Sequence, residues 1–389
     1  MLRLHIENTL DREENIMAEQ FTTLASLTVD GKGSYGIGAS AVPFSKDLYT
    51  YLRITDIKDD GTLNLQDLKS VDDEKASEYL LKPNDIVFAR TGASTGRNYF
   101  YDGTDGEFVY AGFLIKFSID EKKVNPKYIK YFCQSKQYKD WINSFNTGST
   151  RGNINAQTLG KMPIPLIERT TQDALVSILS SIDEKIKKNN EINNNLEQQA
   201  QSIFDNMFPN ISNGSCTIGD YITPKRGKSL LSKNAIFGDV PVIAGGLEPS
   251  TYHNVANTRS PVLAISASGA NAGYVSLWNI PIWSSDSSYI DSSMTDDVYF
   301  WYVLLKKRQK EIFDAQTGSA QPHIYPQHIA SMSVSNLDIE EVHSYTSIVI
   351  PIFEIIGHHK EENTRLASLR DTLLPKLMSG ELDVSNIEL

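Results

Sequence analysis

One segment of the chain occurs twice. The stretch that begins Thr147-Gly148-Ser149 returns as Thr317-Gly318-Ser319, and the same shift of 170 positions aligns the copies without a gap over roughly sixty residues. Identical residues also recur within the aligned stretch, at Ile154/Ile324, Gln157/Gln327 and Met162/Met332. In both copies the segment leads from a mixed stretch into a long polar helix. The chain is therefore predicted to contain two copies of a globule followed by a helix.

The repeat also sets the predicted domain boundaries. They are a first globule over 1–166 with a charged lead-in at 1–20, a helix over 167–209, a second globule over 210–338, and a helix over 339–389. Both globules mix short β-like runs and turn clusters with one aromatic-bearing helix, near 127–144 and 298–312. We therefore expect an α+β fold with two globular domains separated by two long helices.

A heptad spacing runs along each expected helix, apolar at both ends and polar in the middle. Its members are Leu175, Leu179, Ile182, Ile186, Asn189, Asn193, Leu196, Ala200, Ile203 and Met207, then Tyr345, Val349, Ile352, Ile356, His359, Asn363, Leu366, Arg370, Leu373 and Leu377. Two independent surface helices are one interpretation. Long apolar stripes need a partner, however, which favours an antiparallel coiled coil. The polar centre could fix the register or be a solvated weak spot.

Composition narrows the function further. The net charge of −11 argues against indiscriminate binding to polyanions but allows a local basic face. Cys133 and Cys216 form neither a disulfide framework nor a metal-ligand spacing, and the histidines form no ligand pattern, so no metal site is expected. The start of the chain lacks the apolar core of a signal peptide, and no apolar run is long enough for a membrane span. A cytoplasmic location is expected.

Two motifs suggest nucleotide binding or catalysis, but the residues around the first and the internal repeat of the second argue against both functions. Gly31–Gly36 matches the dinucleotide fingerprint, but the residues that follow make a poor helix start. Gly92–Gly96 matches the nucleophile elbow of serine hydrolases, with Ser94 at its tip. The repeat places Asn271 at the equivalent position, so the glycine spacing is shared and the serine is not. We therefore predict no catalytic residue.

What remains is binding chemistry on the repeated loops. Arg, Lys, Asn and Gln contact base edges, and Ser, Lys and Arg hold phosphates. The candidate DNA-binding residues are Arg90, Ser94, Arg97, Asn98, Arg151 and Asn153 in the first globule, and Lys225, Arg226, Lys228, Ser268, Asn271, Gln321 and His323 in the second. The repeated loops carry different side chains at equivalent positions, which suggests two modules that read different half-sites. The alternative for any one of them is an ordinary solvated loop residue.

The order and duplication of these segments resemble the specificity subunits of type I restriction–modification enzymes. The Thr-Gly-Ser segments that lead into each helix carry the resemblance, together with Tyr35–Ala41, Tyr51–Ile57 and Leu81–Val87, which look like parts of that family's target-recognition domains. The second match is looser, because Ala244-Gly245-Gly246 stands where the first globule has Leu-Arg-Ile-Thr. The resemblance adds Arg53 to the candidate DNA contacts.

The resemblance implies a non-catalytic, sequence-specific DNA-recognition subunit. Each globule would read one half of a bipartite, asymmetric site in double-stranded DNA, and the helices would set the gap between the halves. Two methyltransferase subunits would dock on this subunit and supply S-adenosylmethionine. A translocase–nuclease subunit would add ATP and Mg²⁺ for restriction. The rival hypotheses are a coiled-coil scaffold with two protein-binding globules, and a specificity subunit of a type IIB-like or methylation-only system.

Overall fold

The computed structural model describes residues 21–65, 67–145, 153–318, 321–382 and 384. The chain divides into two compact units, Met1–Asp183 with Ala367–Leu389, and Glu184–Leu366. Each unit combines one globule with one end of both long helices, α5 (Arg169–Met207) and α9 (Ile339–Met378). The division therefore cuts across the helices, whereas the sequence-derived ranges treat each helix as its own segment.

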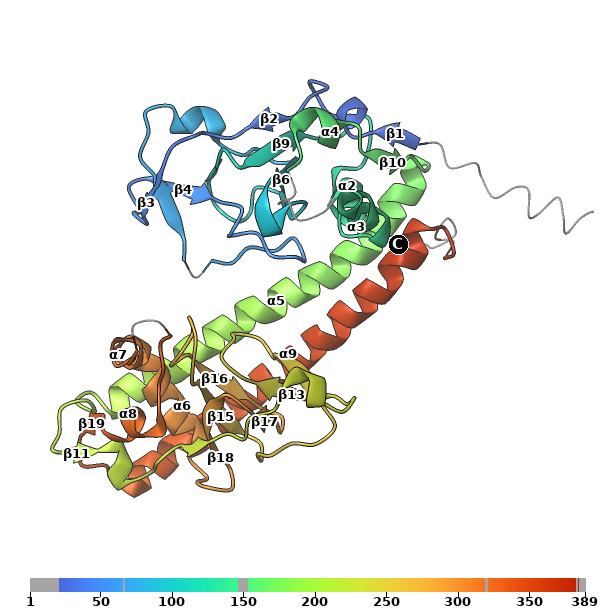
Figure 1. Ribbon diagram of the computed structural model, residues 1–389. Helices are drawn as coiled ribbons and strands as arrows, with labels where there is room; N and C mark the ends of the chain where they lie inside the picture. The colour runs from blue at the N-terminus through green and yellow to red at the C-terminus, as the bar shows by residue number, and fades with distance from the viewer. Residues whose placement is uncertain (1–20, 66, 146–152, 319–320, 383, 385–389) are drawn as a thin grey trace, which may run out of the picture. The chain divides into compact units, whose positions relative to one another are not determined.

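The globule of unit 1 is organised around the strand β6 (Asp85–Ala89), whose five residues are all buried. It lies inside an antiparallel sheet of order β2-β9-β6-β7, and a second sheet of order β3-β5-β4-β8 lies beside it (Figure 1). The other strands are β1 (Phe21–Thr23), β2 (Ser34–Tyr35), β3 (Ala41–Pro43), β4 (Tyr49–Leu52), β5 (Lys69–Val71), β7 (Asn98–Tyr101), β8 (Phe108–Tyr110), β9 (Leu114–Ser118) and β10 (Pro163–Pro165).

Unit 2 has the same plan around β15 (Val262–Ser266), which is also buried throughout. Its sheets have the orders β12-β18-β15-β16 and β14-β13-β17, and β11 pairs with β19 as β1 pairs with β10. The remaining strands are β11 (Cys216–Thr217), β12 (Lys225–Arg226), β13 (Val240–Ile243), β14 (Thr251–His253), β16 (Val275–Trp278), β17 (Trp283–Ser284), β18 (Ser287–Asp291) and β19 (Ser333–Val334).

Backbone hydrogen bonds establish the repeat residue by residue. Ile154 N donates to Arg90 O over 2.9 Å, and Ile324 N donates to Ala267 O over 2.9 Å. The parallel strand pairs β4·β8 and β13·β17 also correspond. Just after β8, Ala111 N donates to Leu52 O over 3.0 Å, and just after β17, Ser285 N donates to Ile243 O over 2.8 Å. The expected fold class is confirmed: two α+β globules related by an internal repeat, with two long helices that pair as an antiparallel coiled coil.

The aromatic-bearing helix expected in each globule is two helices. In unit 1 these are α2 (Pro126–Phe132) and α3 (Lys136–Asn143), and a short helix α4 (Ala156–Gly160) follows. The break occurs because the Ser135 side chain accepts a hydrogen bond from Tyr138 N and caps a new helix. The unit 2 counterparts are α6 (Val298–Lys307), α7 (Gln309–Asp314) and α8 (Pro326–Ala330).

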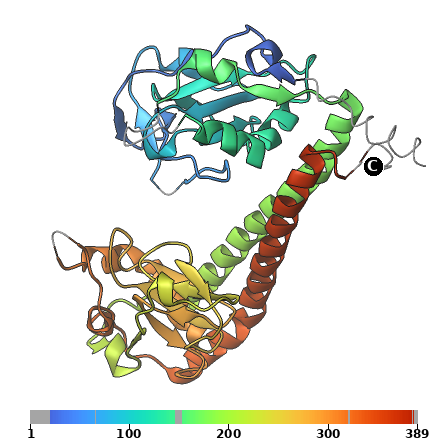
Figure 2. The same cartoon turned by 45° about the vertical axis from the view of Figure 1, so that its right-hand side comes forward.

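Helices α5 and α9 lie side by side (Figure 2). In unit 2 the Asn189 amide donates to Asn363 Oδ1 over 2.8 Å, and Asn193 Oδ1 lies 2.8 Å from His359 Nδ1. A step forward along α5 is thus a step backward along α9, which makes the pair antiparallel. Over the described ranges, none of the helices combines the length and apolar character needed to cross a membrane.

Burial along the expected seam is uneven. Buried members are Leu175, Leu179, Ile182, Asn189, Asn193, Ala200, Tyr345, Val349, Ile356 and Leu377. Half-buried members are Ile186, Leu196, Ile203, Met207, Ile352, His359, Asn363, Leu366, Arg370 and Leu373. Phe204, Phe353 and Leu374, one position beyond half-buried members, are buried instead. Near its ends each helix packs on a globule as well as on its partner, as when Phe353 stacks on Tyr299 of α6 with 4.8 Å between ring centroids. This widens the apolar stripe beyond a strict heptad.

Candidate nucleic-acid interface

The loop after the central strand has the same backbone in both units. Gly92 and Gly96 have φ of +77° and +89°, and Gly269 and Gly273 have +84° and +89°. Gly96 N donates to Ala89 O over 2.9 Å, and Gly273 N donates to Ser266 O over 2.7 Å. Positive φ favours glycine, so the shared glycine spacing encodes a turn. Of the side chains between these glycines, Ala93 and Ala270 are exposed, whereas Ser94 and Ala272 are buried.

Ser94 does not lie in a nucleophile elbow. An elbow needs a strand, a sharp turn and then a helix. Here the loop leads into the strand β7, and the Ser94 hydroxyl is buried with a hydrogen bond of 3.4 Å to Thr91 O. The turn therefore has a structural role, and the geometry gives Ser94 little access to a ligand.

Among the described residues no group of His, Cys, Asp and Glu side chains is suited to hold a metal ion.

The glycines at 31–36 also fold without a helix. Gly36 follows β2, and a Cβ atom there would lie 2.2 Å from Tyr110 O. Gly36 therefore allows a close approach between two backbone segments. A dinucleotide site needs the N-terminus of a helix at these glycines, and the described chain places a strand there.

Unit 1 presents an aromatic and basic surface beside the turn. The Arg90 guanidinium carbon lies 5.0 Å from the centroid of the Tyr35 ring, a cation–π contact. The side chains of Tyr35 and Phe113 are 43% and 59% exposed. Asn153 is exposed and pairs with Thr91 in an isolated β-bridge. Arg90, Asn153 and these two aromatic side chains thus belong to one surface.

Three other candidates in unit 1 have partners within the fold. Arg53 donates from Nη2 to Asp56 Oδ1 over 2.6 Å, and this hydrogen bond raises the pKa of its guanidinium. Arg97 Nε donates to Asp59 Oδ1 over 2.7 Å. Asn98 is buried and donates to Cys133 O over 3.1 Å. Asn98 therefore stabilises the fold, and the two arginines can reach DNA only by leaving or sharing a carboxylate. Arg151 lies outside the described residues.

Unit 2 carries a charged network at the matching place. Arg226 Nη2 donates to Asp286 Oδ1 over 2.5 Å, and the Ser268 hydroxyl donates to the other oxygen of the same carboxylate. Lys225 and Lys228 are exposed on either side of Arg226. The structure thus joins Arg226 and Ser268 through one carboxylate, and the exposed side chains of Lys225 and Lys228 lie next to Arg226 in the chain.

The remaining candidates of unit 2 lie on adjacent loops. Asn271 is half-buried at the tip of the turn, and Gln321 is exposed. The His323 ring stacks on Tyr325 with 6.0 Å between centroids, and its backbone forms a bridge to Ser268. Through that bridge, His323 belongs to the same surface as the charged network.

Strand register identifies residues that sequence motifs missed. Tyr35 pairs with Ile115, and Arg226 pairs with Ser288 at the corresponding position of the other unit. Arg90 N donates to Phe113 O over 3.1 Å, as Ala267 N does to Asp286 O over 3.1 Å. Tyr35 and Phe113 therefore occupy the backbone positions of Arg226 and Asp286. The sequence motifs include Tyr35 but do not relate it to Phe113, Arg226 or Asp286, because only the pairing of distant strands does so.

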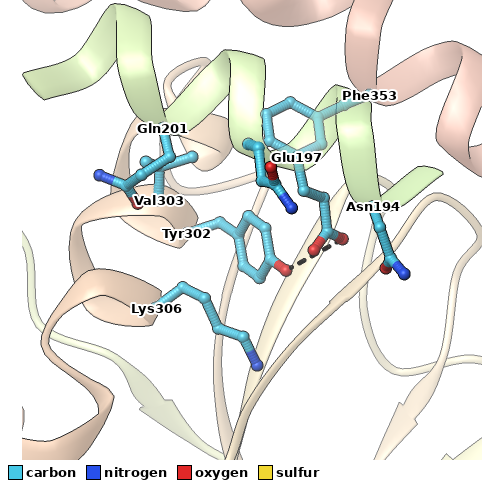
Figure 3. A pocket seen from close by; sticks show the side chains of 8 residues that line it. Asn194, Glu197, Gln201, Tyr302, Val303, Lys306 and Phe353 are labelled. Atoms are coloured by element: carbon cyan, nitrogen blue, oxygen red, sulfur yellow. Dashed lines mark hydrogen bonds between the residues drawn. The ribbon is translucent and has the colours of Figure 1, made fainter. Parts of the chain in front are cut away.

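A separate hollow of about 290 Å³ lies in unit 2 between α5 and α6 (Figure 3). Tyr302 extends into it, with its hydroxyl 3.5 Å from Glu197 Oε1. Burial lowers the pKa of Lys306, which donates to Val275 O over 3.2 Å. None of the DNA-contact candidates lines this hollow, so it is distinct from the surface described above.

Several known proteins that are similar to this chain are specificity subunits of type I restriction–modification systems. Residues 45–198 match the model of the type I restriction modification DNA specificity domain. The type I restriction enzyme MjaIX specificity subunit of Methanocaldococcus jannaschii is 23% identical over 310 residues, which cover 69% of this chain and 72% of that protein. The chain is thus similar to specificity subunits of type I restriction–modification systems. A type I specificity subunit of Mycoplasma genitalium is 24% identical over 278 residues, covering 67% of this chain and 72% of the other.

A solved structure supports the fold of this chain. The crystal structure of the S subunit of a type I restriction–modification system from M. genitalium has a TM-score of 0.55 and 20% sequence identity, and the match covers 93% of this chain and 96% of that one. At this identity the likeness concerns the fold. The two repeated surfaces carry the candidate side chains Arg90 and Asn153 in unit 1 and Arg226 and His323 in unit 2.

Proposed function

We propose that the chain reads a bipartite, asymmetric site in double-stranded DNA, with one half-site for each unit. The observation that carries the proposal is the repeated backbone with different side chains at matching surface positions. Unit 1 has Tyr35 and Arg90 where unit 2 has Arg226 and Ala267. A constant frame fixes how each unit approaches DNA, and the variable side chains on it select the bases. Two different sets then imply two different half-sites.

The long helices would set the gap between the half-sites. Helix α5 has 39 residues and α9 has 40, which corresponds to about 58–60 Å of helix. One turn of DNA is about 34–36 Å, so helices of this length suit a gap that brings the half-sites one to one and a half turns apart. Hydrogen-bonded seam pairs such as Asn189 with Asn363 give the helices a defined register, which a spacer needs.

The partners are part of the proposal, and the similarity to type I specificity subunits supports them. Two methyltransferase subunits would dock on this chain, bring S-adenosylmethionine and methylate an adenine that they rotate out of each half-site. A translocase–nuclease subunit would join through them, with ATP and Mg²⁺, for cleavage. The chain itself would contribute recognition and no chemical step.

The test is a methylation map. The chain is expressed with its cognate methyltransferase in cells without other adenine methylation, and modified adenines are read by long-read sequencing. A split motif with a fixed gap is expected, and omission of the chain should abolish it. A matched experiment replaces residues 22–145 with the corresponding globule of another family member, which should change one half-site and leave the other and the gap unchanged. Methylation that does not depend on the chain would refute the proposal and favour a scaffold.

A further inference from the structure

Arg226 and Asp286 form an ion pair on the surface of unit 2, and neighbouring strands and the Ser268 hydroxyl fix its position. Arg226 lies on β12, which pairs with β18, and Asp286 immediately precedes β18. The Ser268 hydroxyl donates to the Asp286 carboxylate and fixes its orientation. The two charged side chains are 41% and 37% exposed, so both reach solvent. The pair is therefore ordered but accessible, as a recognition element must be.

The fold itself does not require this pair. A surface ion pair with this exposure contributes little to stability, because water and salt screen both charges. The same two backbone positions in unit 1 carry Tyr35 and Phe113, which cannot form an ion pair, and the sheet there has the same strand order and register. The same sheet therefore forms with either pair of residues, Tyr35 and Phe113 or Arg226 and Asp286. Arg226 and Asp286 must then serve a purpose other than folding.

The chemistry of the pair fits one base pair. Arginine donates two hydrogen bonds to O6 and N7 of guanine, and aspartate accepts one from N4 of cytosine. Among the described contacts the Arg226 guanidinium uses only Nη2, toward Asp286, which leaves other N–H groups to face a base. A guanidinium beside a carboxylate thus presents donors next to an acceptor, the complement of the major-groove edge of a G·C pair. Lys225 and Lys228, exposed on both sides, suit the flanking phosphates.

We propose that Arg226 and Asp286 read a G·C base pair in the half-site recognised by unit 2. This inference rests on the proposed function and names one of its specificity-determining contacts. Arg226 selects the guanine, Asp286 selects the cytosine, and Ser268 positions the carboxylate. Unit 1 lacks the pair and reads its half-site with the Tyr35, Arg90 and Phe113 surface.

The experiment maps methylation with Arg226→Ala, Arg226→Lys and Asp286→Asn in the full complex. Arg226→Ala should lower methylation at the original site by about tenfold to a hundredfold and relax one G·C position of one half-site. Arg226→Lys keeps the charge and the stem but loses the planar fork, so it should retain methylation and still relax that position. Asp286→Asn should admit other bases in place of cytosine. Arg365→Ala is the matched control, because Arg365 forms an exposed pair with Glu361 on α9, and it should leave the motif unchanged.

The outcomes separate this inference from the proposed function. An unchanged motif with Arg226→Lys and Asp286→Asn overturns the inference, while methylation that still depends on the chain keeps the proposed function. Relaxation at a position other than G·C overturns it as well. If Arg226→Ala fails to fold, judged by circular dichroism, the Arg226→Lys and Asp286→Asn maps decide. Relaxation confined to the half-site of unit 1 would also contradict it.

Discussion

The Nδ1 atom of His359 lies 2.8 Å from Oδ1 of Asn193, at the centre of a seam that is apolar toward its ends. One turn away, the Asn189 amide donates to Asn363 Oδ1 and to Glu362 Oε2. The sequence left open whether this polar centre fixes the register or is a solvated weak spot. Side chains that pair across the helices favour the first interpretation, because a shifted register would leave the buried Asn193 without its partner.

Replacement of Asn193 by Leu should destabilise the chain, because it removes the partner of His359. The expected loss is about 1–2 kcal/mol in the free energy of unfolding. The double variant Asn193→Leu with His359→Leu should recover most of it, because both polar groups leave together. Urea unfolding followed by circular dichroism measures both. Asn195→Leu, an exposed neighbour on α5, is the control and should have little effect. Additive losses in the double variant would contradict the pairing.

Asp183 should make the stability of unit 1 dependent on acid pH. Burial raises the pKa of Asp183, but Lys130 at 2.8 Å, Tyr131 at 2.9 Å and Arg370 at 3.1 Å outweigh it, and the pKa lies below its ordinary value. A carboxyl with a lowered folded-state pKa stabilises above its unfolded pKa of about 4, and that contribution is lost as pH falls through the folded-state pKa.

The corresponding variant is Asp183→Asn. It should cost about 2 kcal/mol at pH 7, and the difference from the parent chain should shrink below about pH 4. Thermal unfolding over a pH series measures this. Asp140→Asn, which breaks an exposed pair with Lys136, should leave the melting temperature unchanged. A deficit that persists undiminished at pH 2 would argue against an ionic origin.

The turn glycines should tolerate alanine to different degrees. A Cβ atom on Gly96 would lie 2.5 Å from Ile142 Cγ2, and one on Gly273 would lie 2.8 Å from Ile312 Cγ2. Each also has a positive φ, so Gly96→Ala and Gly273→Ala should cost about 2–4 kcal/mol. Gly92 has a positive φ but open space around its Cβ position, and Gly92→Ala should cost only about 1 kcal/mol. Equal losses in chemical denaturation would show that the contacts with isoleucine do not matter.

A matched lengthening of both helices should lengthen the unread gap. Seven residues inserted after Lys187 in α5 and seven after Thr364 in α9 preserve the heptad spacing and add about 10 Å. The methylated motif should then keep both half-sites, and its gap should grow by about three base pairs. Insertion into α5 alone is the control, because it shifts the seam pairs out of register and should abolish methylation. An unchanged gap in the double insertion would refute the spacer role.

The isolated chain should bind DNA weakly. Affinity for DNA comes largely from neutralised phosphates, and this chain has a net charge of −11. Fluorescence anisotropy at physiological salt should show weak binding alone and tight, specific binding once the methyltransferase subunits are added. Lys228→Ala should weaken the assembled complex similarly on all sequences and reduce its salt dependence. Tight specific binding by the chain alone would contradict this expectation.

The sequence by itself determined the repeat, the α+β class and the two long helices. Each depends on local signals: periodic apolar residues, glycines that require positive φ, and a duplicated Thr-Gly-Ser segment. The contrast of Ser94 with Asn271 was sufficient to identify the loop as a shared turn, because the glycines alone dictate its backbone.

Only the tertiary structure decided which surface residues act together. Asn98 and Arg90 are both polar residues beside the same turn, yet Asn98 is buried on Cys133 O and Arg90 lies over Tyr35. Tyr35 and Arg226 became comparable through strand register, and Asp286 joined Arg226 because β12 pairs with β18. Such relations join positions far apart in the chain, and local spacing cannot encode them. The role of the polar centre of the seam likewise depends on a contact between two helices, the pair of His359 and Asn193.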